Sequence, residues 1–401
     1  MAHPILNTLK VGTFLGIRSI TRGNKAVLGL TVLVLALVYI NLLFFPALLS
    51  GLIKTINDMQ ISVGTSNFIL LPRDGNSYFT DASALKSRAE KVEGVEAVAS
   101  RTAIGTEIEF DGRVSTYGTY IVDPEEYVTV FDIEKYMVEG EFLETGDLNQ
   151  IVLGVQVAGA DDTSVELYAS SLKSVHVGDK IRLRAGELEQ TLNVKGIFKT
   201  GTVQNDLRSF VSERAMGLAM PEREDTASSI HIKMDSGYTS DDKYDENETL
   251  SALSALSSVE HPLTAVAWQD MAGIMVSVTG TFESIIRIIQ SVALVVGGIT
   301  VFVVTYVDIL NKRRQIELQR ALGIGTSAIV VGNALRALVL VTVGVIFGAL
   351  LYVFVITPLE AAYPFSFPFG DALLVTSTGS FLVMGGVLAL TALAAAVTPR
   401  V

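Results

Sequence analysis

The sequence predicts an α-helical membrane protein with four transmembrane helices and an extracytoplasmic α+β domain of two subdomains, carried on helical stalks. The first observation is that 49% of the 401 residues are hydrophobic. The second is a long, polar and acidic segment in the first two thirds of the chain. The third is a set of charge-free stretches, each long enough to cross a bilayer, which takes about 20 apolar residues. These stretches are Ala26–Ile53, Ile288–Val307, Ala337–Leu359 and Ala372–Pro399.

Residues 1–25 are predicted to form a cytoplasmic amphipathic helix, and residues 26–57 a first transmembrane helix with a stalk. Apolar side chains recur at helix-like spacing beside Lys10 and Arg18, which is typical of a helix lying on a membrane surface. They are Ile5, Leu9, Phe14 and Ile17. The apolar run that follows is longer than the ~7–15 residues of a signal-peptide core. We therefore interpret it as an uncleaved anchor.

Residues 58–268 are predicted to form the extracytoplasmic α+β domain. Each end of this segment shows the order strand, helix, strand, and Asp81 is placed to cap the first helix. We expect the two units to form one layer of sheet and helices. The expected strands are 67–71, 95–100, 229–234 and 263–268, and the expected helices are 82–91 and 248–256.

A strand-rich subdomain, from about residue 105 to 225, is predicted to be inserted between these units. Alternating polarity on both sides of a glycine turn in 180–198 indicates a β-hairpin. The segment 149–159 has the composition of a buried strand. The segment 208–220 is typical of a strand followed by a helix, with Ser212 at the cap position.

The rest of the chain is predicted to alternate between membrane and solvent. The expected segments are 269–310 (stalk and second transmembrane helix), 311–326 (cytoplasmic helix), 327–357 (third transmembrane helix), 358–370 (extracytoplasmic loop) and 371–398 (fourth transmembrane helix). Arg336, at the inner end of the third span, is expected to extend toward the headgroups. Because no acidic or basic residue lies in the middle of a span, the sequence does not favour a proton relay or an ion pathway.

Glycines in the spans are candidates for close helix packing. Gly344 and Gly348 have the four-residue spacing of packed membrane helices, and Gly297 and Gly298 narrow the second span. The alternative is that membrane helices simply tolerate glycine.

The charge distribution predicts the orientation. The first 53 residues carry Lys10, Arg18, Arg22 and Lys25 and no acidic residue, whereas the whole chain has a net charge of -12. Short loops rich in Lys and Arg stay in the cytoplasm. We therefore expect a multi-pass protein of the cell membrane with both termini cytoplasmic and the acidic segment outside. Its acidic balance argues against nucleic acid as a partner.

Several kinds of chemistry are missing from the sequence. It contains no P-loop, no G-x-S-x-G and no H-E-x-x-H motif, so we expect neither an enzyme nor a metal site in this chain. The chain has no cysteine and four scattered histidines. The acidic segment 241–248 lacks the pattern of an EF-hand and reads as a solvated loop. Asn247 opens an N-x-T glycosylation triplet, which is a weak signal.

The cytoplasmic segment 311–327, "NKRRQIELQRALGIGTS", holds the strongest signal. Its basic start fits the positive-inside rule. The following residues, Gln315 to Gly323, are strong helix formers ended by a glycine, and Leu318 and Leu322 form an (i, i+4) apolar pair. A charged loop that only fixes the topology does not require this pattern. We therefore expect a short amphipathic helix below the membrane.

This segment resembles the signature of MacB/LolC/FtsX-type ABC transporter permeases. The family pattern is close to R-x-x-E-I-G-x-x-R-A-L-G-A, followed by an aliphatic helix with G-x-x-x-G. The matching residues are Ile316, Arg320, Ala321, Leu322 and Gly323, and the departures are Gln315, Glu317, Ile324 and Asn333. The order of one span, a large outer domain and three spans is also similar, and so are the segments 122–143 and 177–198.

The resemblance implies that the loop helix is a coupling helix that docks on a separate ABC ATP-binding subunit of MacB/LolD/FtsE type. The implied coupling residues are Arg313, Arg314, Gln315, Ile316, Glu317, Leu318, Arg320, Ala321, Leu322 and Gly323. ATP and Mg would be bound by that partner and no cofactor by this chain. A second permease copy or a paralogue completes the implied assembly in the lipid membrane.

The implied function is export or extraction of a peptide, drug, lipid or lipoprotein, driven by ATP hydrolysis in the partner. An FtsX-like signal transducer that controls an extracytoplasmic enzyme is the alternative, although FtsX-like outer domains are smaller. A third hypothesis, a membrane-anchored adhesion or receptor protein without an ATPase, leaves the coupling-helix pattern unexplained.

Overall fold

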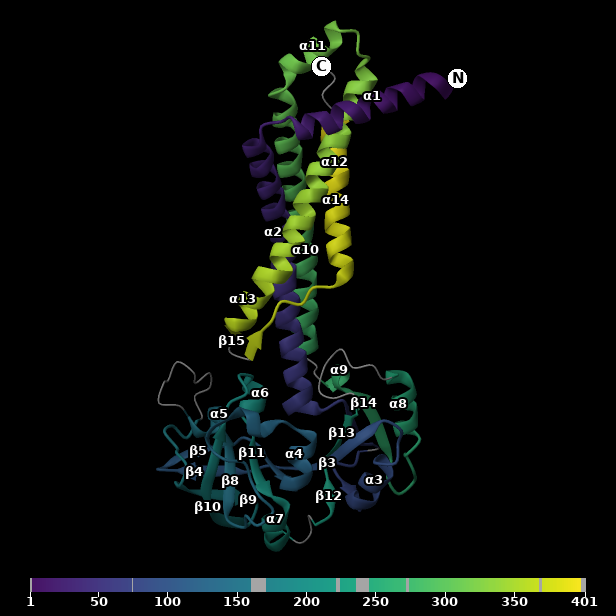
Figure 1. Cartoon of the computed structure of the whole chain (residues 1–401). Helices are drawn as coiled ribbons and strands as arrows, with labels where there is room; N and C mark the ends of the chain where they lie inside the picture. Colours follow the sequence, from purple (N-terminus) through teal and green to yellow (C-terminus); the bar gives the residue numbers. More distant parts are fainter. Residues whose placement is uncertain are drawn as a thin grey trace. The chain divides into compact units, whose positions relative to one another are not determined.

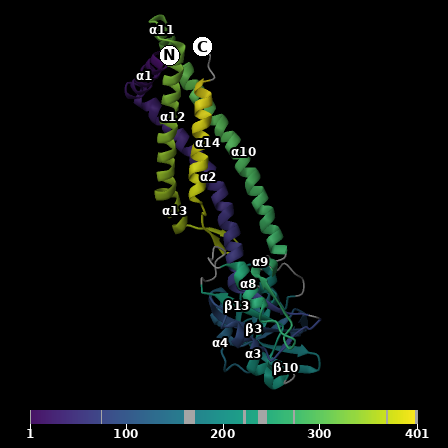
Figure 2. The same cartoon turned by 90° about the vertical axis from the view of Figure 1, so that its right-hand side faces the viewer.

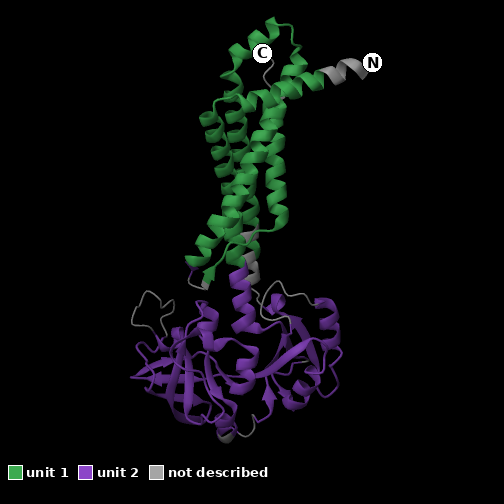
Figure 3. Ribbon diagram, in the orientation of Figure 1, with its two compact units in different colours: residues 1–53, 279–365, 371–401 green, residues 54–278, 366–370 purple. Residues whose placement is uncertain are grey.

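The computed structural model describes residues 2–73, 75–159, 171–220, 224–235, 245–271, 274–367 and 370–397. The chain divides into two compact units (Figure 3). The membrane unit contains residues 1–53, 279–365 and 371–401, and the outer unit contains residues 54–278 and 366–370. Much of the predicted segment 241–248 lies outside the described residues.

The outer unit is built on a twelve-stranded sheet (Figure 1). Its strands are β1 (Phe68–Pro72), β3 (Val95–Ile104), β4 (Glu107–Phe110), β5 (Arg113–Ser115), β6 (Thr119–Val122), β7 (Met137–Gly140), β8 (Gln150–Gly154), β9 (Lys180–Ala185), β10 (Leu188–Phe198), β11 (Ser209–Ser212), β13 (Ser229–Met234) and β14 (Leu263–Ala267). A separate two-stranded pair joins β2 (Phe79–Thr80) to β12 (Thr226–Ala227).

The first subdomain is an antiparallel layer with the strand order β14-β1-β13-β3. The two strand–helix–strand units of the sequence interleave in it, which is the arrangement of a split β-α-β motif. Helices α3 (Ala82–Ala89) and α8 (Glu246–Ser254) connect the strands of each unit. Apolar side chains of both helices, among them Leu85 and Leu253, pack with the sheet in one buried cluster. The interleaving brings the two ends of the outer segment together.

The second subdomain continues the same sheet in the order β6-β11-β8-β10-β9-β4-β5. The predicted hairpin is present, because β9 and β10 pair antiparallel from Leu188–Ala185 to Asn193–Lys180. Strand β3 belongs to both subdomains, since it pairs with β13 and with β6. The short helices of this part are α4 (Pro124–Val130), η2 (Ile133–Tyr136), α5 (Val155–Ala158), α6 (Val203–Asp206) and α7 (Glu213–Ala219).

Three local predictions are wrong. Asp81 and Ser212 occupy the N-cap positions of α3 and α7, but neither side chain accepts a capping hydrogen bond. At α3 the backbone N–H of Ser83 donates instead to the carboxylate of Asp225 at 2.8 Å, so a residue distant in sequence supplies the cap. The segment 149–159 is strand only as far as Gly154 and then turns into α5.

Among the residues that the structure describes, four helices are long and apolar enough to span a membrane (Figure 2). The candidate spans are Lys25–Thr65, Ser284–Leu310, Thr326–Ala362 and Thr378–Ala396. The helices are α1 (Ala2–Thr21), α2 (Lys25–Met59), α10 (Ile274–Leu310), α11 (Arg313–Ala321), α12 (Thr326–Leu351), α13 (Thr357–Ala362) and α14 (Thr378–Val397). The π-helical turn η5 (Tyr352–Ile356) belongs to the membrane unit, whereas the π-helical turn η1 (Gln60–Thr65) and helix α9 (Trp268–Met271) belong to the outer unit. Strands β15 (Phe365–Phe367) and β16 (Gly370–Ala372) contain residues of both.

The last span begins later than the charge-free stretch indicates. Helix α14 starts at Thr378, and the residues before it are extended. This extended segment lies against α2, since the backbone N–H of Val375 donates to the carbonyl oxygen of Ala47 at 3.1 Å. A Cβ on Gly51 would lie 1.7 Å from the carbonyl oxygen of Leu373. Glycine at this position therefore allows the close crossing.

Candidate functional site

The predicted cytoplasmic helix is α11, in the short connection between α10 and α12. Its residues favour helix intrinsically, and Arg313 Nε lies 3.1 Å from Glu317 Oε1 in an exposed (i, i+4) ion pair. Because both side chains are exposed, this pair adds only a few tenths of a kcal/mol, roughly 0.3–0.5.

A Schellman motif ends α11. Gly323 has a φ of +84°, a left-handed conformation that glycine adopts without a Cβ clash. The N–H of Gly323 donates to the carbonyl of Arg320 at 2.9 Å, and that of Ile324 donates to Gln319 at 3.1 Å. These bonds satisfy carbonyls that the helix leaves open at its end. The motif fixes the direction in which the chain enters α12.

Two sets of apolar side chains on α11 have opposite environments. Ile316 is 7% exposed and packs into the membrane unit's core with Ile309 and Ile329. Leu318 is 60% and Leu322 81% exposed. Ile316 thus holds the helix on the membrane unit, while the leucine pair faces away from the core. The other predicted coupling residues are exposed as well, namely Arg313, Arg314, Gln315, Glu317, Arg320, Ala321 and Gly323.

A group of polar side chains, which we call the inner polar cluster, lies next to the start of α11. It consists of Ser19, Asp308, Lys312 and Arg336. Arg336 donates to Ser19 Oγ at 2.8 Å and to Asp308 Oδ1 at 3.1 Å. Lys312 Nζ lies 3.4 Å from each of the same two side chains. The cluster therefore joins α1, α10 and α12 to the residue that precedes α11.

The expectation that Arg336 extends toward the headgroups is wrong. Arg336 is 4% exposed, and it is directed into the protein by the carboxylate of Asp308 and the hydroxyl of Ser19. Its Nε has no hydrogen-bond partner among the described residues. Removing one member of a buried ion pair typically costs about 3–5 kcal/mol, because the other charge is left uncompensated. Asp308 and Arg336 lie on different helices, α10 and α12, and no local sequence pattern pairs them.

Helix α1 packs against α12 through glycines that sequence reasoning missed. A Cβ on Gly12 would lie 2.9 Å from the carbonyl oxygen of Ala328, and one on Gly16 would lie 2.9 Å from that of Gly332. The four-residue spacing of Gly12 and Gly16 was a usable signal, since it is the spacing noted in the third span. The predicted apolar side chains Leu9, Phe14 and Ile17 are exposed.

The predicted packing glycines differ in their surroundings. Gly344 and Gly348 face α2, where added Cβ atoms would lie 2.7 Å from Leu35 Cβ and 2.9 Å from the Ala36 carbonyl oxygen. At Gly297 the nearest atom would be Leu42 Cδ1 at 3.2 Å. At Gly298 the contact would be an ordinary 3.6 Å. Close approach therefore depends most on Gly344 and Gly348.

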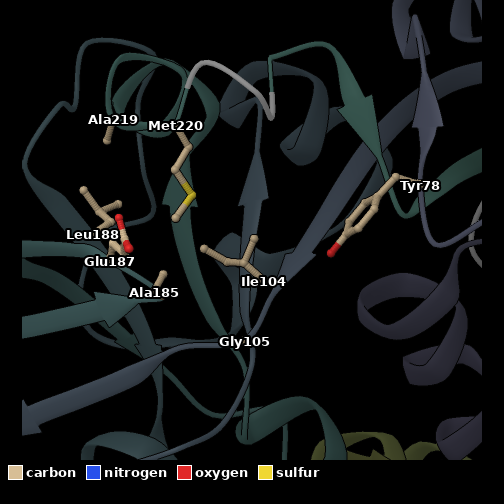
Figure 4. A pocket seen from close by; sticks show the side chains of 9 residues that line it. Tyr78, Ile104, Gly105, Ala185, Glu187, Leu188, Ala219 and Met220 are labelled. Atoms are coloured by element: carbon tan, nitrogen blue, oxygen red, sulfur yellow. The ribbon is translucent and has the colours of Figure 1, made fainter.

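A separate cavity of about 530 Å³ lies in the outer unit (Figure 4). Figure 4 shows Glu187 and Leu188 on one side, Tyr78 on the other, and Ile104 and Met220 between them. Its walls are polar and apolar in similar measure, and the Tyr78 hydroxyl already donates to the Ala103 carbonyl oxygen at 2.9 Å. Among the described residues that line it, no nucleophile is paired with a base.

Two further predictions concern the surface. Asn247 is exposed in the first turn of α8, so its glycosylation stays a prediction. Across the described ranges there is no group of three or more His, Cys, Asp or Glu side chains able to hold a metal ion.

The described residues thus form four helices long and apolar enough to cross a membrane, a separate α+β unit, and an exposed helix in one short loop. Comparison with known proteins finds a matching family model and a similar permease. Residues 287–400 match the model of the FtsX-like permease C-terminal domain. An uncharacterized ABC transporter permease from Methanocaldococcus jannaschii is 24% identical over 341 residues, covering 82% of this chain and 80% of that protein. Residues 287–400 are thus similar to FtsX-like permeases, and most of the chain is similar to an ABC transporter permease.

Two solved structures also resemble the chain. The extracellular domain of the noncanonic ABC-type transporter YknZ from Gram-positive bacteria is 14% identical, with a TM-score of 0.33, and covers 50% of this chain and 98% of that domain. The periplasmic region of MacB from Actinobacillus actinomycetemcomitans is 15% identical, with a TM-score of 0.35, and covers 54% of this chain and 95% of that region.

Proposed function

We propose that this chain is a permease subunit that couples ATP hydrolysis by a separate cytoplasmic ATPase to movement of its own extracytoplasmic domain. The observation that carries the proposal is the pair of exposed leucines on α11, Leu318 and Leu322, on a helix held to the membrane unit by buried Ile316. An exposed apolar pair beside basic side chains suits a groove on a partner protein. ATP and Mg²⁺ are bound by that partner.

In this proposal both termini and α11 are cytoplasmic. The ATPase moves α11, and the inner polar cluster passes that displacement to α1, α10 and α12, because its hydrogen bonds connect all three helices. Two permease chains, identical or paralogous, act with two ATPase subunits. The work done outside is export or extraction of a peptide, drug, lipid or lipoprotein.

The first test removes the apolar contact of α11. Leu318→Asp together with Leu322→Asp is expected to weaken binding of the ATP-binding subunit about 30-fold or more, since a buried contact of roughly 2 kcal/mol is lost. Binding is measured by co-purification and titration of the full chain in nanodiscs with an ABC ATP-binding subunit from the same organism. Val259→Asp is the matched control, because Val259 is a fully exposed apolar residue of the outer unit. Equal binding by the double variant and the control would refute the docking role.

A second measurement separates transport from signalling. If the chain exports or extracts a substrate, cells carrying the double variant lose secretion or resistance at unchanged envelope hydrolase activity. A loss of hydrolase activity alone would instead support an FtsX-like transducer.

A further inference from the structure

The end of the first stalk helix is held by basic side chains rather than by a conventional cap. Helix α2 ends at Met59 and continues into the π-helical turn η1, which belongs to the outer unit. Carbonyl oxygens at a helix end lack intrahelical partners and form the negative pole of the helix dipole. Here three of them, on Val63, Gly64 and Thr65, accept hydrogen bonds from basic residues.

Each basic residue comes from a different part of the sheet. Arg101 on β3 donates to the carbonyl oxygen of Gly64 at 2.7 Å and to that of Val63 at 3.3 Å. Arg208, just before β11, reaches the same Gly64 oxygen at 3.5 Å. His231 on β13 lies 2.8 Å from the Thr65 oxygen through Nδ1. We call Arg101, Arg208 and His231 the stalk socket. It contacts both subdomains, because β13 belongs to the first, β11 to the second and β3 to both.

Arg101 is the centre of the socket. It is 3% exposed, and burial lowers the pKa of its guanidinium, although arginine is not deprotonated in proteins. Aromatic side chains surround it, with the Phe131 ring centre 4.1 Å from Cζ and the Tyr127 hydroxyl 2.7 Å from a guanidinium nitrogen. Ring faces and carbonyl dipoles thus solvate the cation.

The chain leaves the socket by a sharp turn that is fixed at several points. Ser66 has a φ of 61° in the left-handed region, which is uncommon for a residue other than glycine. Its N–H donates to the Ile61 carbonyl at 2.9 Å and its hydroxyl donates to that of Ile232, also at 2.9 Å. The next residues enter β1 directly. The end of the stalk is therefore attached to neighbouring strands on both sides of the turn.

We infer that the stalk socket, with Arg101 as its positioning residue, is the joint that makes the outer sheet move as one body with the end of α2. The inference rests on the proposed function, since a joint of this kind matters only if α2 transmits movement. Its physical basis is that one cation bonds to the last carbonyls of the stalk while it lies on the strand shared by both subdomains. If Arg101 is lost, the stalk stays covalently linked to β1 but is free to tilt against the sheet.

The experiment uses the absence of cysteine from the chain. Asn57→Cys on α2 and Thr191→Cys on β10 provide two spin-label positions within the outer unit, and their distance distribution is measured in the full chain in nanodiscs. Arg101→Met is expected to widen that distribution by roughly a factor of two, because local opening becomes accessible. Arg101→Lys keeps the charge but not the fork of donors, and is expected to widen it too. Arg182→Met, at an exposed arginine on β9, is the matched control.

A second label pair tests the consequence for coupling. With Thr31→Cys and Thr191→Cys, ATP in the presence of the partner ATPase shifts the distance in the parent chain, and Arg101→Lys reduces that shift while ATP hydrolysis continues. A parent chain with no ATP response would refute the proposed function but not the joint. Unchanged distance distributions between positions 57 and 191 in both Arg101 variants would refute the inference that the stalk socket is a joint. If Arg101→Met does not fold, Arg101→Lys and His231→Gln carry the test, with thermal unfolding as the folding check.

Discussion

Two buried arginines show how single residues are accommodated in different surroundings. Arg336 is neutralised by the carboxylate of Asp308, and its position depends on that ion pair. Arg101 bonds instead to backbone carbonyls and lies over aromatic rings. A carboxylate partner makes a cation sensitive to the loss of one residue, whereas carbonyl partners persist whatever the side chains are. Substitution of Asp308 would therefore remove the partner of Arg336, whereas no single side-chain substitution removes the carbonyl partners of Arg101.

His231 leads to a prediction about pH. Burial, and after it the positive charge of Arg101, lower the pKa of His231 well below its usual value, so the folded chain keeps the ring neutral. Its Nδ1 then donates to the Thr65 oxygen and its Nε2 accepts from Ser229. The unfolded state takes up a proton below about pH 6.5 and the folded state does not. The contribution of His231 to the free energy of unfolding is therefore complete above pH 6.5. Below that pH it falls by up to roughly 1.4 kcal/mol per pH unit.

The measurement compares thermal unfolding of the full chain and of His231→Gln in nanodiscs between pH 5 and 8. Other titrating groups, including Asp206 and Glu213, whose pKa values are raised by burial, contribute equally to both proteins. The difference between the two pH profiles therefore isolates His231. We expect the variant to be less stable at pH 8 but to lose less stability on acidification. Parallel profiles would contradict a neutral His231 in the folded state.

Helices and strands were predictable from the sequence where the pattern lies in neighbouring residues, and not where a distant contact decides the structure. Strand β13 and the β9–β10 hairpin follow from alternating polarity, and α11 follows from helix formers ended by Gly323. The cap of α3 did not follow, because the backbone N–H of Ser83 donates to Asp225, far along the chain. The start of α14 was missed for a similar reason. A charge-free extended segment has the composition of a span, and only its contacts with α2 distinguish it.

Helix α1 gives the prediction at this scale. Gly16→Ala should loosen α1 from α12, because the new Cβ would lie 2.9 Å from the carbonyl oxygen of Gly332. Alanine is the better helix former by roughly 1 kcal/mol, so the substitution strengthens the helix itself while weakening its packing. We expect trypsin cleavage at Arg18 and Arg22 to accelerate about 5- to 150-fold, which corresponds to a packing cost of ~1–3 kcal/mol.

Gly29→Ala is the matched control for this experiment. It lies in α2, and no atom would approach its added Cβ within 4 Å. The same gain in helix propensity there should leave cleavage unchanged. If Gly16→Ala were as resistant as the control, α1 would not depend on close contact with α12.

For the whole molecule, the sequence predicted the order of the parts better than their connections. Four charge-free stretches and one acidic segment were enough for the fold class, and the pattern from Gln315 to Gly323 located the exposed helix. The inner polar cluster was not predictable, because Ser19, Asp308 and Arg336 come together only when α1 folds against α10 and α12. The stalk socket likewise joins residues about 40 to 170 positions apart, a separation at which loop closure rather than local pattern decides contact.

The orientation of the chain is the prediction that belongs to this scale. Because the parent has no cysteine, single substitutions report their side of the membrane without background. Three exposed positions serve as reporters, Arg22→Cys near α1, Ser251→Cys on α8 and Arg314→Cys on α11. In intact cells an impermeant maleimide should label only the α8 position, since basic loops stay inside. Permeabilised cells should show labelling at all three. Labelling of position 22 or 314 in intact cells would contradict the proposed orientation. An ATPase in the cytoplasm would then be unable to reach α11.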